Sequence, residues 1–124
     1  VRQMWLEITI KNMNKEIYSS GKVDINGYLT KNTIIYNTVF GDGNGKVISN
    51  ISKAKEILKD RRILPGSYLD EKIKIPKLKN KTITIEVKLL YRSAPQKVLD
   101  MVLGKGKVTL PILDMARIKK TIKI

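Results

Sequence analysis

The chain has 124 residues, of which 42% are hydrophobic, so it has the usual size of one domain and enough apolar material for a single core. Lys and Arg number 25 and Asp and Glu 11, which gives a formal net charge of +14 and predicts attraction to polyanions or to an acidic partner. The chain contains no Cys and no His. This excludes disulfides, a thiolate nucleophile, a Cys or His zinc site, an imidazole base and covalent haem attachment through Cys-x-x-Cys-His.

The N-terminal sequence and the hydropathy give no sign of a membrane segment. No apolar run approaches the ~20 residues needed to cross a bilayer. The first ten residues, VRQMWLEITI, lack the basic and apolar regions of a signal peptide. We therefore expect no membrane span, and the opening Val suggests a processed chain or an excised domain. Enrichment in Lys and Ile with few aromatic residues is also typical of thermophiles.

Alternating apolar and polar residues predict strands in the first third of the chain. Three are expected, over residues 4–11, 16–23 and 33–40. Asn26-Gly27 is a turn signal between the second and third of these strands. The glycine-rich run at 41–45 closes the third strand as a tight loop.

Residues 52–62 form the clearest helical stretch, with Ser52 as the expected N-cap and Pro65 beyond the end. The apolar positions that share one helical face are Ala54, Ile57 and Leu58. A strand is expected next over residues 68–76.

Residues 82–92 predict the longest strand. Its apolar face should supply the central core, with Ile83, Ile85, Val87 and Leu89. A second short helix is expected over 96–103, because Pro95 suits a helix first turn. Two strand-like segments close the chain at 108–116 and 117–124, the latter as an edge strand guarded by Lys.

Several strands, two short helices and no β-α-β alternation predict a mainly β fold, an antiparallel, Ig-like β-sandwich, formed as a single domain over residues 1–124. Lys alternates with Ile, Leu or Thr over residues 72–88. In a strand, that alternation places Lys on the solvent face and the apolar residues in the core. A solvated Lys-rich sheet is therefore favoured over a nucleic-acid face, for which one Phe, one Trp and five Tyr are few stacking residues.

The sequence contains no recognisable catalytic, cofactor-binding or metal-binding motif. Asp42 and Asn44 alternate as calcium ligands do, but the later bidentate Glu is missing, so a turn is favoured. The acids are dispersed singly between cations, which does not suit acid/base catalysis. Asp60 beside Arg61 and Arg62 is interpreted as a salt-bridge and capping cluster at the helix end. We therefore expect no enzymatic activity.

Three residues are candidates for contact with a partner: Trp5, Arg2 and Arg92. Trp5 lies opposite the apolar face of its strand, so a sheet covered on one side would expose it as a partner anchor. The alternative is that both faces are covered locally. Arg92 ends the longest strand and either meets a partner surface or forms a structural ion pair.

Two sequons satisfy N-x-S/T with no Pro between. Asn50 and Asn80 are therefore acceptors for N-glycosylation if the chain is exported. Asn80 lies in a polar turn and is the better candidate, since Asn50 immediately precedes the expected helix.

Six short segments, read together, resemble the haem-free C-terminal β-sandwich domain of multihaem c-type cytochromes. That pattern has a Trp-Leu first strand, a Ser-Gly turn, an Asp-x-x-Gly segment, Phe-Gly-Asp with glycines, Asp-Arg-Ile-x-Pro and a Leu-x-Tyr-Arg strand end. The matching positions are Trp5-Leu6, Ser20-Gly21, Asp24 to Gly27, Phe40 to Gly45, Asp60 to Pro65 and Leu89 to Arg92. The stretch from Asp60 to Pro65 carries one extra residue, and no Cys-x-x-Cys-His segment is present.

The resemblance implies a structural domain of an extracellular or cell-surface electron-transfer protein. Its partner would be the haem-bearing domain or subunit, which would carry haem c, and this chain would hold no cofactor itself. Self-assembly is a further expectation. The competing hypothesis, which rests on charge alone, is an independent basic β-domain that binds a polyanion, either nucleic acid or an acidic surface polymer.

Overall fold

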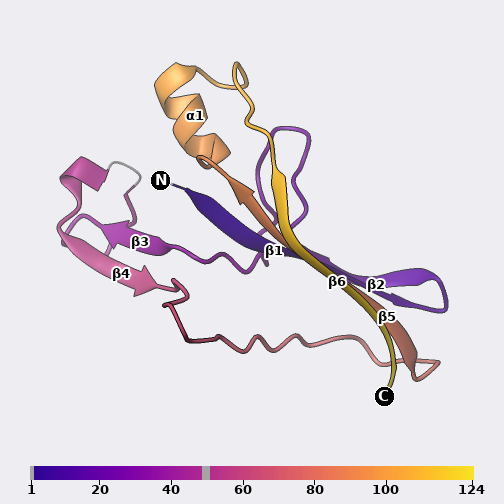
Figure 1. The fold of residues 1–124 in the computed structure, drawn as a ribbon. Coiled ribbons are helices and arrows are strands. Elements are labelled where there is room, and N and C mark those ends of the chain that lie inside the picture. The colour runs from indigo at the N-terminus through magenta and orange to yellow at the C-terminus, as the bar shows by residue number, and fades with distance from the viewer. Residues whose placement is uncertain (1, 49–50) are drawn as a thin grey trace.

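The computed structural model describes residues 2–48 and 51–124 (Figure 1). The fold is mainly β, with two antiparallel sheets, of four and two strands, and one short α-helix in the described part. The elements are β1 (Gln3–Asn12), β2 (Lys15–Ser20), β3 (Thr38–Gly41), a 3-10 turn (Ile51–Lys53), β4 (Glu56–Asp60), β5 (Thr82–Arg92), α1 (Gln96–Leu103) and β6 (Leu113–Lys123).

The larger sheet has the order β2-β1-β5-β6, with every neighbouring pair antiparallel. A two-residue turn joins β1 to β2, and both of its residues, Met13 and Asn14, have positive φ. This is the geometry that matches the twist of two hairpin strands. β1 then pairs along its whole length with β5, from Gln3 opposite Arg92 to Asn12 opposite Ile83.

One face of this sheet carries the core. Ile8, Ile10 and Ile83 are buried there. The extended chain between β4 and β5 runs past the sheet (Figure 1) and packs Ile73 and Ile75 against these residues. The lysines that alternate with them are exposed. The alternation therefore separates core from solvent as expected.

This covering segment is not the predicted strand. Residues 68–76 have no regular secondary structure, and no backbone-to-backbone hydrogen bond joins them to another part of the described chain. The prediction of a paired strand is wrong because side-chain periodicity reports which face is buried and cannot report whether a neighbouring strand is present.

The predicted helix over 52–62 is also wrong. Only a 3-10 turn forms at Ile51–Lys53, and β4 follows, paired with β3 through Phe40 opposite Ile57. A short helix is marginally stable by itself. Pairing with β3 satisfies the backbone of the same residues, with the Arg61 amide donating to the Asn37 carbonyl beyond the strand end at 2.8 Å.

Other expectations agree with the structure. The strands expected over 4–11 and 82–92, the Asn26-Gly27 turn and the helix after Pro95 are confirmed, although β6 is as long as β5, at 11 residues. β6 is an edge strand, as predicted for the Lys-rich C-terminal segment, and forms one strand from Leu113 instead of two. Of the four expected core residues of β5, Ile83 is fully buried, while Ile85 and Val87 pack against the core and Leu89 does not join it.

Across the described ranges, no helix is both long and apolar enough to cross a membrane.

Candidate functional site

A buried cation lies at the end of β5, beside the start of β1. Arg92 is only 4% exposed, and its guanidinium carbon lies 5.2 Å from the centroid of the Trp5 ring. Its Nε donates to Gln3 Oε1 at 2.7 Å and its Nη1 to the Gly27 carbonyl at 2.8 Å. The Trp5 indole N–H donates to the Gly21 carbonyl at 2.9 Å. These residues form what we call the arginine cluster.

The arginine cluster contains a charge without a carboxylate partner. No ion pair involves Arg92 among the described residues. Burial lowers the pKa of its guanidinium, although arginine stays protonated in proteins. The aromatic face and two neutral oxygen acceptors therefore stabilise the charge.

The structure corrects both interpretations of Arg92 and one of Trp5. Trp5 has no exposed surface, so the prediction of an exposed partner anchor is wrong and the face is covered locally. The cover comes from the chain after β2, which pairs beside β1 through a bridge between Trp5 and Ile35 and carries Gly21 and Gly27 over this face. The same cover buries Arg92, so it is not presented at the surface, and it forms no ion pair within the part of the chain that the structure describes.

A second polar set joins this cover to α1. The carboxylate of Asp100 accepts hydrogen bonds from the Tyr28 hydroxyl, from Gln96 Nε2 at 2.8 Å and from the Gly106 amide at 3.1 Å. The Tyr28 bond, followed by those from Gln96 and Gly106, lowers the pKa of Asp100. The same carboxylate raises the pKa of Tyr28. The turn after β2 and the helix are therefore fixed to each other.

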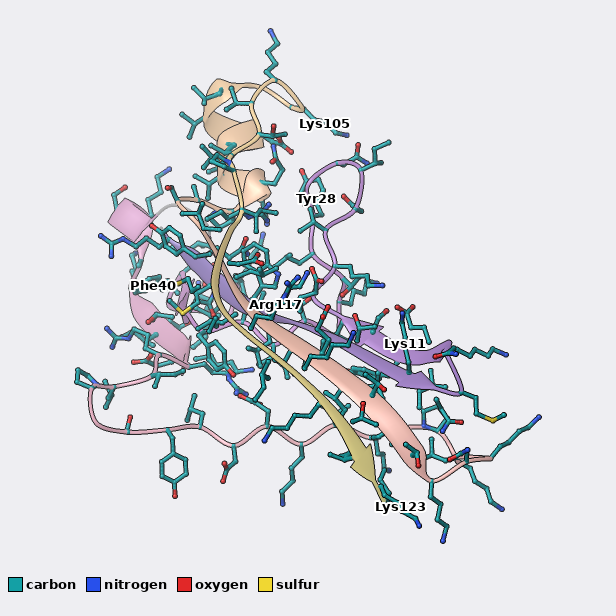
Figure 2. All side chains as sticks on the ribbon, turned by 45° about the vertical axis from the view of Figure 1, so that its right-hand side comes forward. Lys11, Tyr28, Phe40, Lys105, Arg117 and Lys123 are labelled. Carbon is teal, nitrogen blue, oxygen red and sulfur yellow. The ribbon has the colours of Figure 1, made fainter. Side chains whose placement is uncertain are left out.

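An open groove of about 560 Å³ lies between β3, the loop that follows it and the start of α1. Its apolar lining includes Val39, Phe40, Val47, Ile48 and Val98, and its cations are Arg2, Arg62 and Lys97. The label of Phe40 in Figure 2 marks the position of this groove. We call this feature the basic groove.

The three cations of the basic groove are not equivalent. Arg62 is neutralised, since its Nε and Nη2 bind the Asp60 carboxylate at 2.9 and 2.7 Å. This contact holds the pKa of Asp60 far below its usual range and raises that of Arg62. Arg2 and Lys97 make no ion pair within the described residues. The groove therefore offers apolar walls and two uncompensated positive charges.

The Asp60 ion pair was expected, but at the end of a helix, and the structure places it at the end of β4. Arg2 is exposed at the groove, and its role as a partner contact remains a prediction. Sequence reasoning missed Lys97 and the apolar lining. No local signal marks them, because the fold brings residue 2, the β3 region and the start of α1 together from distant parts of the chain.

Asn80 is exposed in the turn before β5, as expected. Its Oδ1 accepts a hydrogen bond from the Thr82 amide at 2.8 Å, and its carbonyl accepts one from Asn12 Nδ2 at 2.6 Å. Its own Nδ2, the atom that a glycan would modify, makes no hydrogen bond to the part of the chain that the structure covers. The other acceptor, Asn50, lies outside the described residues.

The loop after β3 is a turn, as predicted. The Asp42 carboxylate accepts from the amides of Asn44 at 2.8 Å and Lys46 at 3.3 Å, so backbone groups occupy it. Within residues 2–48 and 51–124, no three His, Cys, Asp or Glu side chains are placed to hold a metal ion.

Comparisons with protein-family models, with curated proteins and with solved structures found no match to this chain.

Proposed function

We propose that this chain is a haem-free accessory domain that packs against the haem-bearing region of a multihaem c-type cytochrome, in an extracellular or cell-surface electron-transfer protein. Its role in that assembly is structural. The partner carries haem c and the electrons, and this chain supplies a rigid scaffold and a basic surface.

One observation carries the proposal: four of the six segments of the resemblance contact one another. Four segments meet in the arginine cluster, since Trp5 bonds Gly21, and Arg92 lies over Trp5 and bonds Gly27. The other two segments begin on neighbouring strands, with Phe40 on β3 opposite Ile57 and Asp60 on β4 opposite Thr38. These contacts give four separate segments one shared structural role, which supports treating them as parts of one signature.

The basic groove is the surface that suits the proposed partner. A haem edge presents a broad apolar ring and two propionate carboxylates. The apolar lining suits the former, and Arg2 and Lys97 suit the latter. With no Cys or His in the sequence, this chain supplies no thiolate or imidazole ligand, so the iron remains the partner's.

The β-sandwich architecture belongs to the same proposal. The unpaired extended segment packs on the core face of the four-stranded sheet, and β3 and β4 form a separate two-stranded sheet, so the described chain contains no full second layer. Exposed apolar side chains lie on β4 and on the chain that follows it, among them Ile57, Leu64 and Tyr68. In the proposed assembly the partner covers them and completes a closed two-layer structure.

The test is purification of the protein from its source under gentle conditions, followed by an absorption spectrum and an intact mass of whatever accompanies it. We expect a haem Soret band, with peptides holding Cys-x-x-Cys-His joined to this chain or bound to it. Amine cross-linking should then connect Lys97 with the haem-bearing region. A colourless preparation that carries nucleic acid would refute the proposal and favour the polyanion-binding hypothesis.

Charge-reversal variants test whether the basic groove is the surface that contacts the haem-bearing partner. Arg2→Glu and Lys97→Glu should weaken the complex, and Lys31→Glu is the matched control, since Lys31 is exposed in a loop and does not line the groove. Equal effects of all three changes would show that net charge alone matters.

A further inference from the structure

One edge of β6 is not paired with another strand of the described chain. The other edge pairs with β5. Every residue of β6 is exposed, including Ile118 at 51% and Ile122 at 39%. Natural proteins commonly shorten, cover or bend such an edge, or place charges on it as here, because it can pair with another chain. Here eleven residues are left open.

The hydrogen-bond pattern shows which residues serve the open edge. Just beyond β6, the Ile124 amide donates to the Lys81 carbonyl at 2.7 Å, so residue 124 bonds toward β5. In an antiparallel ladder, bonded and non-bonded pairs alternate. The backbone groups that point away from β5 therefore belong to Arg117, Lys119, Thr121 and Lys123.

The chemistry of the open edge follows the same alternation. The residues with outward backbone groups carry their side chains on the face opposite the core, and three of the four are cations. Two of these cations, Arg117 and Lys123, are labelled in Figure 2. Ile118 and Ile122 lie on the core face, paired with Val87 and Ile83. No cation of β6 forms an ion pair in the described part of the chain. An added strand would meet positive charge on one face, and on the core face it would meet Ile118 and Ile122 with Lys120 between them.

We propose that the open edge of β6 binds an extended acidic strand from a partner protein by β-augmentation. The partner's acidic side chains lie beside Arg117, Lys119 and Lys123, and its apolar side chains lie beside Ile118 and Ile122. Its backbone continues the sheet. This inference does not depend on the cytochrome proposal.

Charge excludes a second copy of this chain as the preferred occupant. Antiparallel pairing of two β6 strands centred on Lys120 would place Arg117 of one copy opposite Lys123 of the other. Pairing centred on residue 119 would place Lys119 opposite Lys119 of the other copy. Like charges directly opposite destabilise a strand pair. An acidic strand turns each of these contacts into an opposite-charge pair.

The experiment uses the whole chain and a blocked heptapeptide of alternating Glu and Val, Glu at both ends. Amide exchange by NMR should show the Ile118, Lys120 and Ile122 amides protected before the peptide is added, because they bond to β5. The Lys119 and Thr121 amides should become protected only after it is added. Failure of the peptide to protect them would overturn the proposal.

Matched peptides separate strand pairing from charge attraction. N-methylation of the two central Glu residues removes donors that face β6 and should weaken binding about fivefold per lost bond, whereas N-methylation of two Val residues should not. A peptide with Lys in place of Glu should not bind. Equal binding of both N-methylated peptides would contradict β-augmentation.

One variant tests the edge without changing its charge. Thr121→Pro removes an outward donor, which an edge strand tolerates, and should weaken binding about fivefold or more. Thr121→Val keeps that donor and should bind normally. Unchanged protection of Ile118 and Ile122 shows that each variant is folded. Two further outcomes would overturn the proposal. In the first, a single-stranded oligonucleotide protects the Lys119 and Thr121 amides as the peptide does. In the second, the protein forms a dimer that Thr121→Pro abolishes, and the peptide does not bind.

Discussion

The guanidinium of Arg92 lies over the Trp5 indole, with its carbon 5.2 Å from the ring centroid, although these residues are 87 positions apart in sequence. The antiparallel pairing of β1 with β5 brings them together, since Trp5 is opposite Leu90 and Gln3 opposite Arg92. The chain that covers them bonds to both side chains through carbonyl oxygens. The contact therefore fixes that cover to the centre of the larger sheet.

Replacing Arg92 should destabilise the fold even when the charge is kept. In Arg92→Lys, the single ammonium group cannot replace the planar guanidinium that donates to both Gln3 and Gly27. We therefore expect a loss of about 1–2 kcal/mol in the free energy of unfolding. Arg117→Lys, on the exposed edge strand, should cost less than about 0.5 kcal/mol. Urea unfolding followed by the fluorescence of Trp5, the only tryptophan, measures both. Equal costs would contradict a structural role for the arginine cluster.

Gly27 should resist substitution for a second reason besides its positive φ of 88°. A Cβ at this position would lie 2.6 Å from Gln96 Oε1, and Gln96 is buried and held by Asp100 and by the Val108 carbonyl. Gly27→Ala should therefore add an overpacking cost of about 1–3 kcal/mol to the conformational one. Gly66→Ala is the control, because Gly66 also has positive φ and its Cβ would meet nothing within 4 Å. Similar melting temperatures for the two variants would exclude the steric cost.

Acid should weaken the contact between α1 and the turn that carries Tyr28. The pKa of Asp100 is lowered by hydrogen bonds from Tyr28, Gln96 and Gly106, in that order. A carboxyl with a lowered folded pKa stabilises the protein above its usual value of 3.8 and loses that contribution as the pH falls toward the folded value.

Asp100→Asn should remove this part of the acid dependence of the urea midpoint, measured from about pH 5 to about pH 2. Asp70→Asn is the comparison, because Asp70 is exposed and makes no ion pair among the described residues. If the urea midpoint of both variants falls with acid as much as that of the parent protein, the Asp100 contact contributes nothing to stability.

Local patterns were sufficient where an element's neighbours have little influence on it. β1 and β5 alternate over most of their lengths, and α1 begins after a proline and ends before Gly104, so these elements were predicted. Residues 52–62 have a helical pattern too, but the partner strand β3 determines their structure. The burial of Trp5 could not be predicted for a related reason. Only the tertiary structure shows that the turn containing Gly21 covers it.

The candidate site was less predictable than the fold. Arg2 was identified as a contact residue, yet its neighbours in the basic groove, Phe40 and Lys97, come from distant segments and carry no shared motif. Arg92 was singled out from its position at a strand end, but its burial depends on the Asn26-Gly27 turn folding back over it. Sequence therefore identified individual residues, and the pairing of strands determined their environments.

The extended segment before β5 should combine mobile amides with essential side chains. Its amides have no backbone partner in the described chain over residues 68–76, so they should exchange with solvent rapidly, while those of β1 and β5 exchange slowly. Ile75 nevertheless packs on the core, and Ile75→Ala should cost about 1–2 kcal/mol, with Lys74→Ala near zero. Slow exchange throughout 68–76 would mean that a strand pairs with this segment in solution, and equal costs for the two variants would mean that it does not cover the core.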